Sequence, residues 1–249
     1  MVDYLPLITT IVSFAFFVLL VRQYLQRHKI HQLLWTIAML FYSASALMEF
    51  LMNSDVMGAS IPLFRIYYIL AAPLVGLLGA GVMYLLTRKI VAKLFLGFVI
   101  MFSLLLALTG FLTPINSTTF ASNFSGSLAN NLMNASTAFP MTVRAFAIVL
   151  NIFGGLALLG GALYSFVRDM SRTYNIFLGI GGLLPMLGGS LLGLLNNSDV
   201  FFEFELGGTI FLFIGFVMSA RYVNKKGAAR MGIPSTLGTR VDSTKSGIQ

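Results

Sequence analysis

Seven long apolar runs, separated by shorter polar stretches, dominate the hydropathy pattern of this chain. Most approach the length of about 20 residues that an α-helix needs to cross the roughly 30 Å hydrocarbon core of a bilayer. The pattern therefore predicts an all-α membrane protein with seven transmembrane helices in a domain covering residues 1–222. The predicted spans are 5–21, 32–52, 61–87, 94–113, 141–167, 174–195 and 204–221.

Charged residues are distributed asymmetrically between the two sets of loops. All 16 Lys and Arg residues except Arg65 and Arg144 fall on one side, whereas the opposite loops carry Asp3, Asp55 and Asp199. The positive-inside rule then predicts an N-terminus outside, a cytoplasmic C-terminus and a multi-pass protein of the cell membrane. The net charge of +8 follows this topology, so we expect no nucleic-acid partner.

Two segments outside the apolar runs have their own composition. The loop 114–140 is rich in Ser, Thr, Asn and Ala, is predicted to lie outside, and carries candidate glycosylation sites at Asn116, Asn123 and Asn134. The tail 223–249 is polar and lacks apolar periodicity, which predicts a disordered cytoplasmic segment.

Short sequence identities indicate an internal repeat. Val21-Arg22 and Val167-Arg168 end equivalent spans, and Asn53–Val56 matches Asn197–Val200 at a similar offset. These positions predict three spans, a linker span and three more spans in the same orientation, a 3+1+3 parallel repeat of the kind found in some membrane transporters.

Small residues recur at a spacing of four within the spans. Such spacing lets helices approach closely, either inside one bundle, between copies in a homo-oligomer or against other membrane subunits. The pairs are Gly76 with Ala80, Ala157 with Gly161, and Gly189 with Gly193.

Several charged residues lie near the predicted outer ends of the spans. Glu49 ends the second span and Arg65 begins the third, so a short loop would let them pair and reduce the cost of burying each charge. Two interpretations are open for the wider group, a structural ring of ion pairs or a vestibule for a ligand or ion. Its members are Glu49, Arg65, Tyr67, Tyr68, Arg144, Glu203 and Glu205.

The stretch Arg65–Leu74, RIYYILAAPL, resembles the third helix of microbial rhodopsins, and Leu183-Leu-Pro185 in the sixth span fits the same family. The resemblance implies an opsin-like bundle with a central pocket, and Arg65 is the pump residue that it carries over. Phe201–Tyr222 contains no lysine, however, so covalent retinal is excluded and light-driven pumping is not expected. Trp35–Ala38 with Glu49 is also similar to a group of prokaryotic seven-span membrane proteins.

Residue composition narrows the function classes. The chain has no cysteine, and its two histidines, His28 and His31, lie in one polar loop, so we expect neither a metal centre nor an enzyme. The first hypothesis is a non-catalytic subunit of a larger membrane complex or a sensor for an apolar ligand. No cofactor is expected, although a bound lipid, carotenoid or quinone would suit such a pocket. The alternative is a transporter or channel for a small solute or ion, built on the 3+1+3 repeat.

Overall fold

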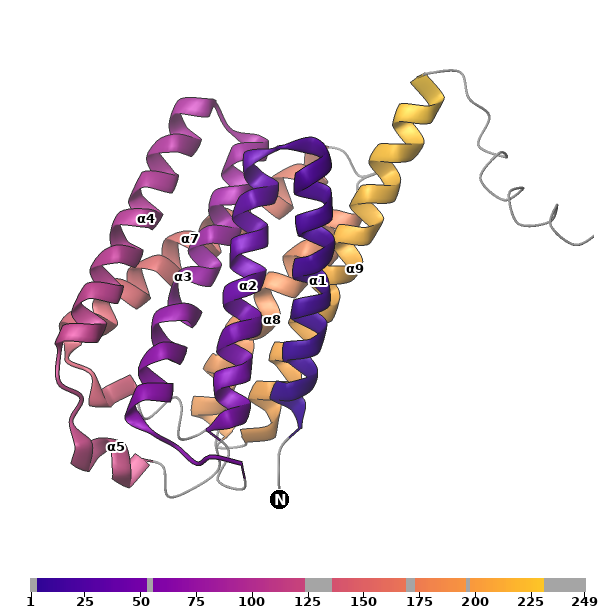
Figure 1. Ribbon diagram of the computed structural model, residues 1–249. Helices are drawn as coiled ribbons and strands as arrows, with labels where there is room; N and C mark the ends of the chain where they lie inside the picture. Colours follow the sequence, from indigo (N-terminus) through magenta and orange to yellow (C-terminus); the bar gives the residue numbers. More distant parts are fainter. Residues whose placement is uncertain (1–3, 53–55, 124–135, 169–172, 196–197, 231–249) are drawn as a thin grey trace, which may run out of the picture.

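The computed structural model describes residues 4–52, 56–123, 136–168, 173–195 and 198–230, and this part of the chain is all-α (Figure 1). Its helices are α1 (Leu5–Arg27), α2 (Ile30–Leu51), α3 (Ile61–Leu86), α4 (Lys89–Leu112), α5 (Ser117–Asn123), η1 (Ser136–Ala138), α7 (Met141–Arg168), α8 (Tyr174–Leu195) and α9 (Ser198–Arg230). Within the described residues, α1, α2, α3, α4, α7 and part of α9 are long and apolar enough to cross a membrane. The chain is therefore a multi-pass membrane protein.

The predicted spans and the observed helices differ mainly at their ends. In α8, the described apolar stretch is the shorter segment Ile176–Pro185, so the seven-span count and the orientation stay predictions. Helix α9 continues to Arg230, beyond residue 223, where the sequence predicts disorder to begin. Lys225, Lys226, Ala228 and Ala229 favour helix formation there. The rest of the predicted tail lies outside the described residues.

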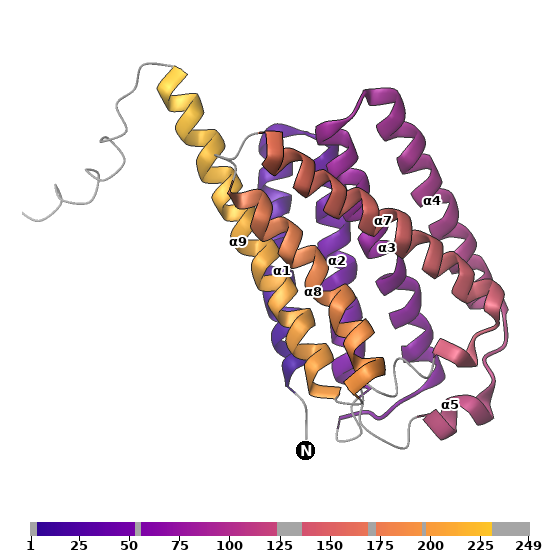
Figure 2. The ribbon, with the colours of Figure 1, turned by 180° about the vertical axis from the view of Figure 1, so that it is seen from behind.

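The long helices form a ring with one helix outside it (Figures 1 and 2). Helices α1, α2, α3, α7, α8 and α9 each pack on the next, α9 returns to α1, and α4 packs against α3 and α7. The pairing of the six ring helices is unchanged when α1–α3 are exchanged for α7–α9, as a 3+1+3 parallel duplication requires, whereas α4 packs on α3 and α7 and does not follow this symmetry. The duplication itself stays a prediction, because residues 53–55 and 197 of the matching motif lie outside the described part.

Glycines allow the closest helix contacts in the ring. A Cβ atom on Gly154 of α7 would lie 2.5 Å from the backbone nitrogen of Gly76 in α3, and one on Gly79 would lie 2.5 Å from the Gly154 carbonyl oxygen. Between α8 and α9, a Cβ atom on Gly181 would lie 2.6 Å from the Leu212 nitrogen. Backbone therefore packs directly on backbone at these crossings, and Gly76 serves packing within the bundle.

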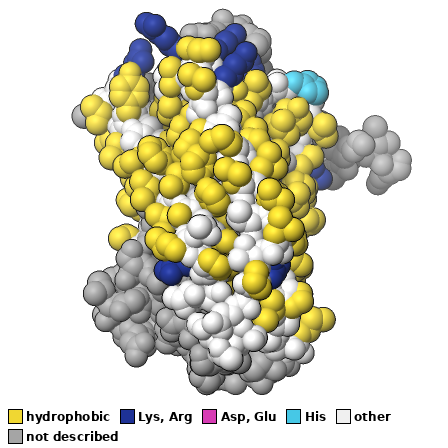
Figure 3. Space-filling view, turned by 90° about the vertical axis from the view of Figure 1, so that its left-hand side faces the viewer, with side chains coloured by type: hydrophobic (Ala, Val, Ile, Leu, Met, Phe, Trp, Pro, Cys, Tyr) yellow, Lys and Arg dark blue, Asp and Glu magenta, His cyan; other side chains and the backbone are white. Residues whose placement is uncertain are grey.

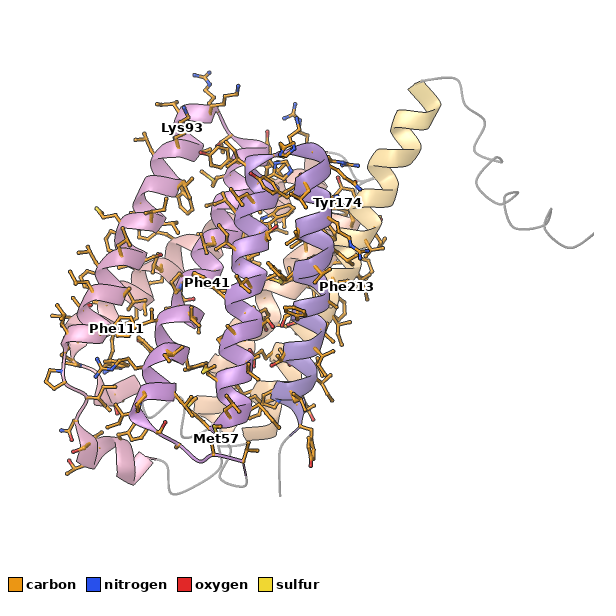
Figure 4. All side chains as sticks on the ribbon, in the orientation of Figure 1. Phe41, Met57, Lys93, Phe111, Tyr174 and Phe213 are labelled. Carbon is orange, nitrogen blue, oxygen red and sulfur yellow. The ribbon has the colours of Figure 1, made fainter. Side chains whose placement is uncertain are left out.

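The outer surface has the distribution of side chains that lipid contact requires. Apolar side chains cover the middle of the bundle, and Lys and Arg side chains gather toward one end (Figure 3). Lys93 lies at that end and Met57 at the other, near the start of α1 (Figure 4). On the lipid-facing side, Leu104 of α4 and Leu156 of α7 are 65% and 66% exposed. Such a continuous apolar surface would be unfavourable in water.

Candidate functional site

A cavity of about 370 Å³ lies inside the ring, between α2, α3, α7, α8 and α9. We call it the acidic cavity, because two glutamates and no Lys, Arg or His belong to its described lining. Most of the lining is apolar. Its polar members are Tyr42, Ser45, Glu49, Tyr67, Tyr68, Asn151 and Glu205.

Glu49 of α2 and Glu205 of α9 meet in this cavity although 156 positions separate them in the sequence. Both are buried, with 1% and 5% of their surface exposed. Their carboxyl groups lie within hydrogen-bonding reach of each other, and the Tyr67 hydroxyl reaches Glu49. Oxygen Oε2 of Glu205 has no hydrogen-bond partner in the part of the chain that the structure describes. A buried polar atom of this kind is costly unless a ligand or water satisfies it.

Hydrogen bonds to the backbone hold Glu205 in position. The Tyr42 hydroxyl and the Thr209 hydroxyl both donate to the Glu205 carbonyl oxygen, each over 3.0 Å. The Ser45 hydroxyl donates to the Tyr42 carbonyl oxygen at 3.0 Å. The Tyr42 contact connects α2 to α9, and the other two lie within α9 and within α2. The backbone that carries Glu205 is thus fixed against α2.

The ion pair with Glu49 stays a prediction, and Arg65 binds the end of α4. Its guanidinium donates to the carbonyl oxygens of Gly110 and Phe111, the latter at 2.6 Å. Both carbonyls belong to the last turn of α4, where four acceptors lack intrahelical partners and the helix dipole is negative. The two helices are antiparallel neighbours, so the start of α3 lies beside this end.

We expect Arg65→Gln to lower the melting temperature of the protein in detergent. Glutamine is too short and too weak a donor to replace two charge-assisted hydrogen bonds, so the loss should be about 1–3 kcal/mol. Arg88→Gln, in the exposed turn between α3 and α4, is the matched control. Equal melting temperatures for the two variants would show that the α4 contact does not stabilise the bundle.

The other predicted site residues divide between the cavity and the surface. Tyr68 lines the cavity and its ring packs on Phe139, with centroids 4.9 Å apart, while Arg144 is close enough to Tyr68 to interact electrostatically. Glu203 is exposed, because a step of two residues turns a helical side chain to the opposite face from Glu205. Among the described residues the structure shows a carboxyl pair, an arginine bound to α4 and an exposed glutamate, and the ring of ion pairs stays a prediction.

Two of the three candidate glycosylation sites, Asn116 and Asn123, lie at the end of the bundle that carries α5. Asn116 is exposed, and its side-chain oxygen accepts hydrogen bonds from the Thr118 hydroxyl and the Thr119 amide at 2.6 Å and 3.0 Å. Asn123 ends α5, and Asn134 lies outside the described residues. Occupancy of all three stays a prediction.

Sequence reasoning missed Tyr42, Ser45 and Thr209. The signal was present, since Tyr42 and Ser45 precede Glu49 by seven and four positions and Thr209 follows Glu205 by four. Residues at these spacings share one face of a helix. The helix faces that carry Glu49 and Glu205 therefore identify Tyr42, Ser45 and Thr209 from the sequence alone.

A second cavity of about 240 Å³ lies toward the other end of the ring. We call it the basic cavity, because Arg27 and His31 line it and no acidic residue belongs to its described lining. Gln32 also lines it, and its Oε1 has no hydrogen-bond partner within the described residues. The two cavities share three lining residues, Leu78, Leu158 and Leu212.

The described residues contain no group of three or more His, Cys, Asp or Glu that could hold a metal ion. No protein-family model, curated protein or solved structure matches this chain. The likeness to microbial rhodopsins therefore stays a resemblance carried by a few motifs. The findings establish an all-helical membrane protein with long apolar helices around a central acidic cavity.

Proposed function

We propose that this chain is a non-catalytic integral membrane protein that binds a small, largely apolar ligand in the acidic cavity. The observation that carries the proposal is the buried carboxyl group of Glu205, which lines the cavity and has one oxygen without a hydrogen-bond partner among the described residues. The cavity volume falls within the roughly 300–1,000 Å³ typical of small-molecule sites, which are mostly apolar with a few placed polar groups. Such binding serves either a sensor or a subunit of a larger membrane complex.

The polar groups of the lining suit binding better than catalysis. They are carboxyls, phenols, one hydroxyl and one amide, and the described lining offers no histidine or lysine as an activating base. Nucleophilic catalysis needs a nucleophile and a base within reach of each other. Tyr42 and Thr209 are committed to backbone contacts, which favours a fixed binding surface.

The proposal is tested by filling the cavity. Ala147 of α7 is 5% exposed and lines the acidic cavity, so Ala147→Phe should occupy ligand space. We expect wild-type protein purified in mild detergent to carry a small molecule, detected by mass spectrometry and absorption, and the variant to lose most of it. Leu104→Phe on the lipid-facing side of α4 is the control. Equal content in all three proteins would contradict the proposal.

A second candidate function is transport, and the observation that favours it is the basic cavity. The two cavities approach each other from opposite ends of the ring and meet at Leu78, Leu158 and Leu212. Two cavities separated by a narrow apolar layer are what a gated path requires, since hydrophobic constrictions block ions and water by dewetting. We call these three residues the leucine septum.

Neighbouring groups hold the leucine septum in place. The Trp35 indole nitrogen donates to the Leu78 carbonyl oxygen at 3.2 Å. Leu158 fills the space that a side chain on Gly182 would need. A Cβ atom on Gly182 would lie 2.5 Å from Cδ2 of Leu158. Leu212 packs over Gly181 in the same way. Helix α8 therefore supplies glycines where the septum leucines of α7 and α9 enter.

A further inference from the structure

We propose that the ligand of the acidic cavity is a small primary ammonium ion with an apolar body, bound with its ammonium group between Glu49 and Glu205. The inference rests on the proposed ligand-binding function and adds the chemical class of the ligand. Three features of the cavity support it, namely its charge, its free hydrogen-bond acceptors and its apolar walls.

The charge of the cavity favours a cation. Two carboxyl groups within hydrogen-bonding reach in an apolar interior either share a proton or need a bound cation to stay ionised together. Neither Arg65 nor Arg144 belongs to the described lining of this cavity, since Arg65 binds the end of α4 and Arg144 lies beside the Tyr68 side chain. A bound cation would thus complete the charge balance of the cavity.

The acceptors match the three donors of a primary ammonium group. Oxygen Oε2 of Glu205 has no partner among the described residues and can accept one hydrogen bond. The Glu49 carboxyl can accept a second, and the Tyr67 hydroxyl oxygen, which reaches Glu49, can accept a third. The rings of Tyr42 and Tyr68 also line the cavity and can stabilise a cation through their faces.

The remaining walls favour an apolar body on that cation. Ala71, Ala72, Val75, Ile148 and Pro185 line the cavity beside the tyrosines. A strongly hydrated inorganic ion would lose its water here without enough oxygen ligands in return, whereas an alkylammonium would bury its carbon atoms favourably.

Protons and the ammonium ion should compete for the same carboxyl pair, so affinity should fall as pH is lowered. The titratable groups that interact with Glu205 are Glu49 and Tyr42 from α2 and Tyr67 from α3. Tyr68 of α3 lines the same cavity, and Arg144 of α7 lies beside it. An alkylammonium keeps its own charge across the neutral and acidic range. The loss of binding in acid would therefore report protonation of the protein.

The test compares two probes of the same shape, cyclohexylmethylammonium and cyclohexylmethanol, by calorimetry on the full-length protein in detergent. We expect the ammonium compound to bind more tightly by about tenfold or more, the effect of a charge-assisted hydrogen bond. Glu205→Gln should remove that advantage. Glu203→Gln, two residues away on the exposed face of α9, should leave it unchanged.

Two further measurements keep the outcome interpretable. If Glu205→Gln does not fold, Glu49→Gln and the pH profile of the wild-type protein test the same carboxyl pair. Equal binding of amine and alcohol, abolished by Ala147→Phe, would overturn the ammonium assignment and leave the ligand-binding function standing. Binding of neither probe, together with unchanged small-molecule content in Ala147→Phe, would overturn both.

Discussion

Gly154→Leu should prevent recovery of a folded, monodisperse protein. The added Cβ would lie 2.5 Å from the Gly76 nitrogen and 2.6 Å from the Val75 carbonyl carbon, so α3 and α7 would have to separate. Backbone atoms cannot rotate away as a flexible side chain can, and we expect a loss of at least about 3 kcal/mol, at the upper end for overpacking. Size-exclusion chromatography and thermal melting in detergent measure the effect.

The control for this substitution lies on the same helix. Gly160 is exposed, and a Cβ atom there would meet no atom within 4 Å. Gly160→Leu adds the same side chain to α7 with the same gain in helix propensity, and should leave the elution profile and melting temperature close to wild type. Equal changes in elution profile and melting temperature for the two variants would show that the close α3–α7 contact does not cause the effect of Gly154→Leu.

Leu158→Ala should open a proton leak between the two cavities. Leu158 is 4% exposed and belongs to both linings, so its truncation removes atoms from the leucine septum and lets the cavities join. Water can enter a widened apolar constriction and carry protons. We expect proton flux into proteoliposomes, driven by a potassium diffusion potential and read with an enclosed pH dye, to rise by about tenfold or more.

Leu156→Ala is the matched control, since Leu156 lies two residues away on α7 and is 66% exposed toward lipid. It makes the same chemical change without touching either cavity. Flux through Leu158→Ala that equals flux through Leu156→Ala would remove the support that the basic cavity gives to transport. A proton leak seen only with Leu158→Ala would support transport as the function.

The bundle and half of its site could be predicted because apolar length and charge placement are local properties of the sequence. The apolar runs identify the spans, and the rarity of buried carboxylates singles out Glu49 and Glu205. Their partners could not be predicted in the same way. Which helices meet across the ring depends on backbone contacts such as that between Gly154 and Gly76, which are fixed only by the folded packing.

Arg65 illustrates the limit most clearly. Sequence proximity to Glu49 suggested an ion pair, but α4 returns antiparallel beside α3 and presents its terminal carbonyls to the guanidinium. The free carbonyl oxygens at the end of a helix accept hydrogen bonds, but the positions of charged residues in the sequence do not reveal them. Glu203 shows the reverse case, in which an acidic residue near the site is turned away by the helical repeat.

Thiol labelling of Ser45→Cys tests most directly whether the acidic cavity is a binding site for cations. The chain has no cysteine, so the introduced thiol is the sole target, and Ser45 is 2% exposed yet lines the cavity. We predict that the folded variant reacts with an ethylammonium methanethiosulfonate reagent, and faster than with the sulfonate analogue. Reaction only after denaturation, or a faster reaction with the anionic reagent, would contradict an accessible acidic cavity.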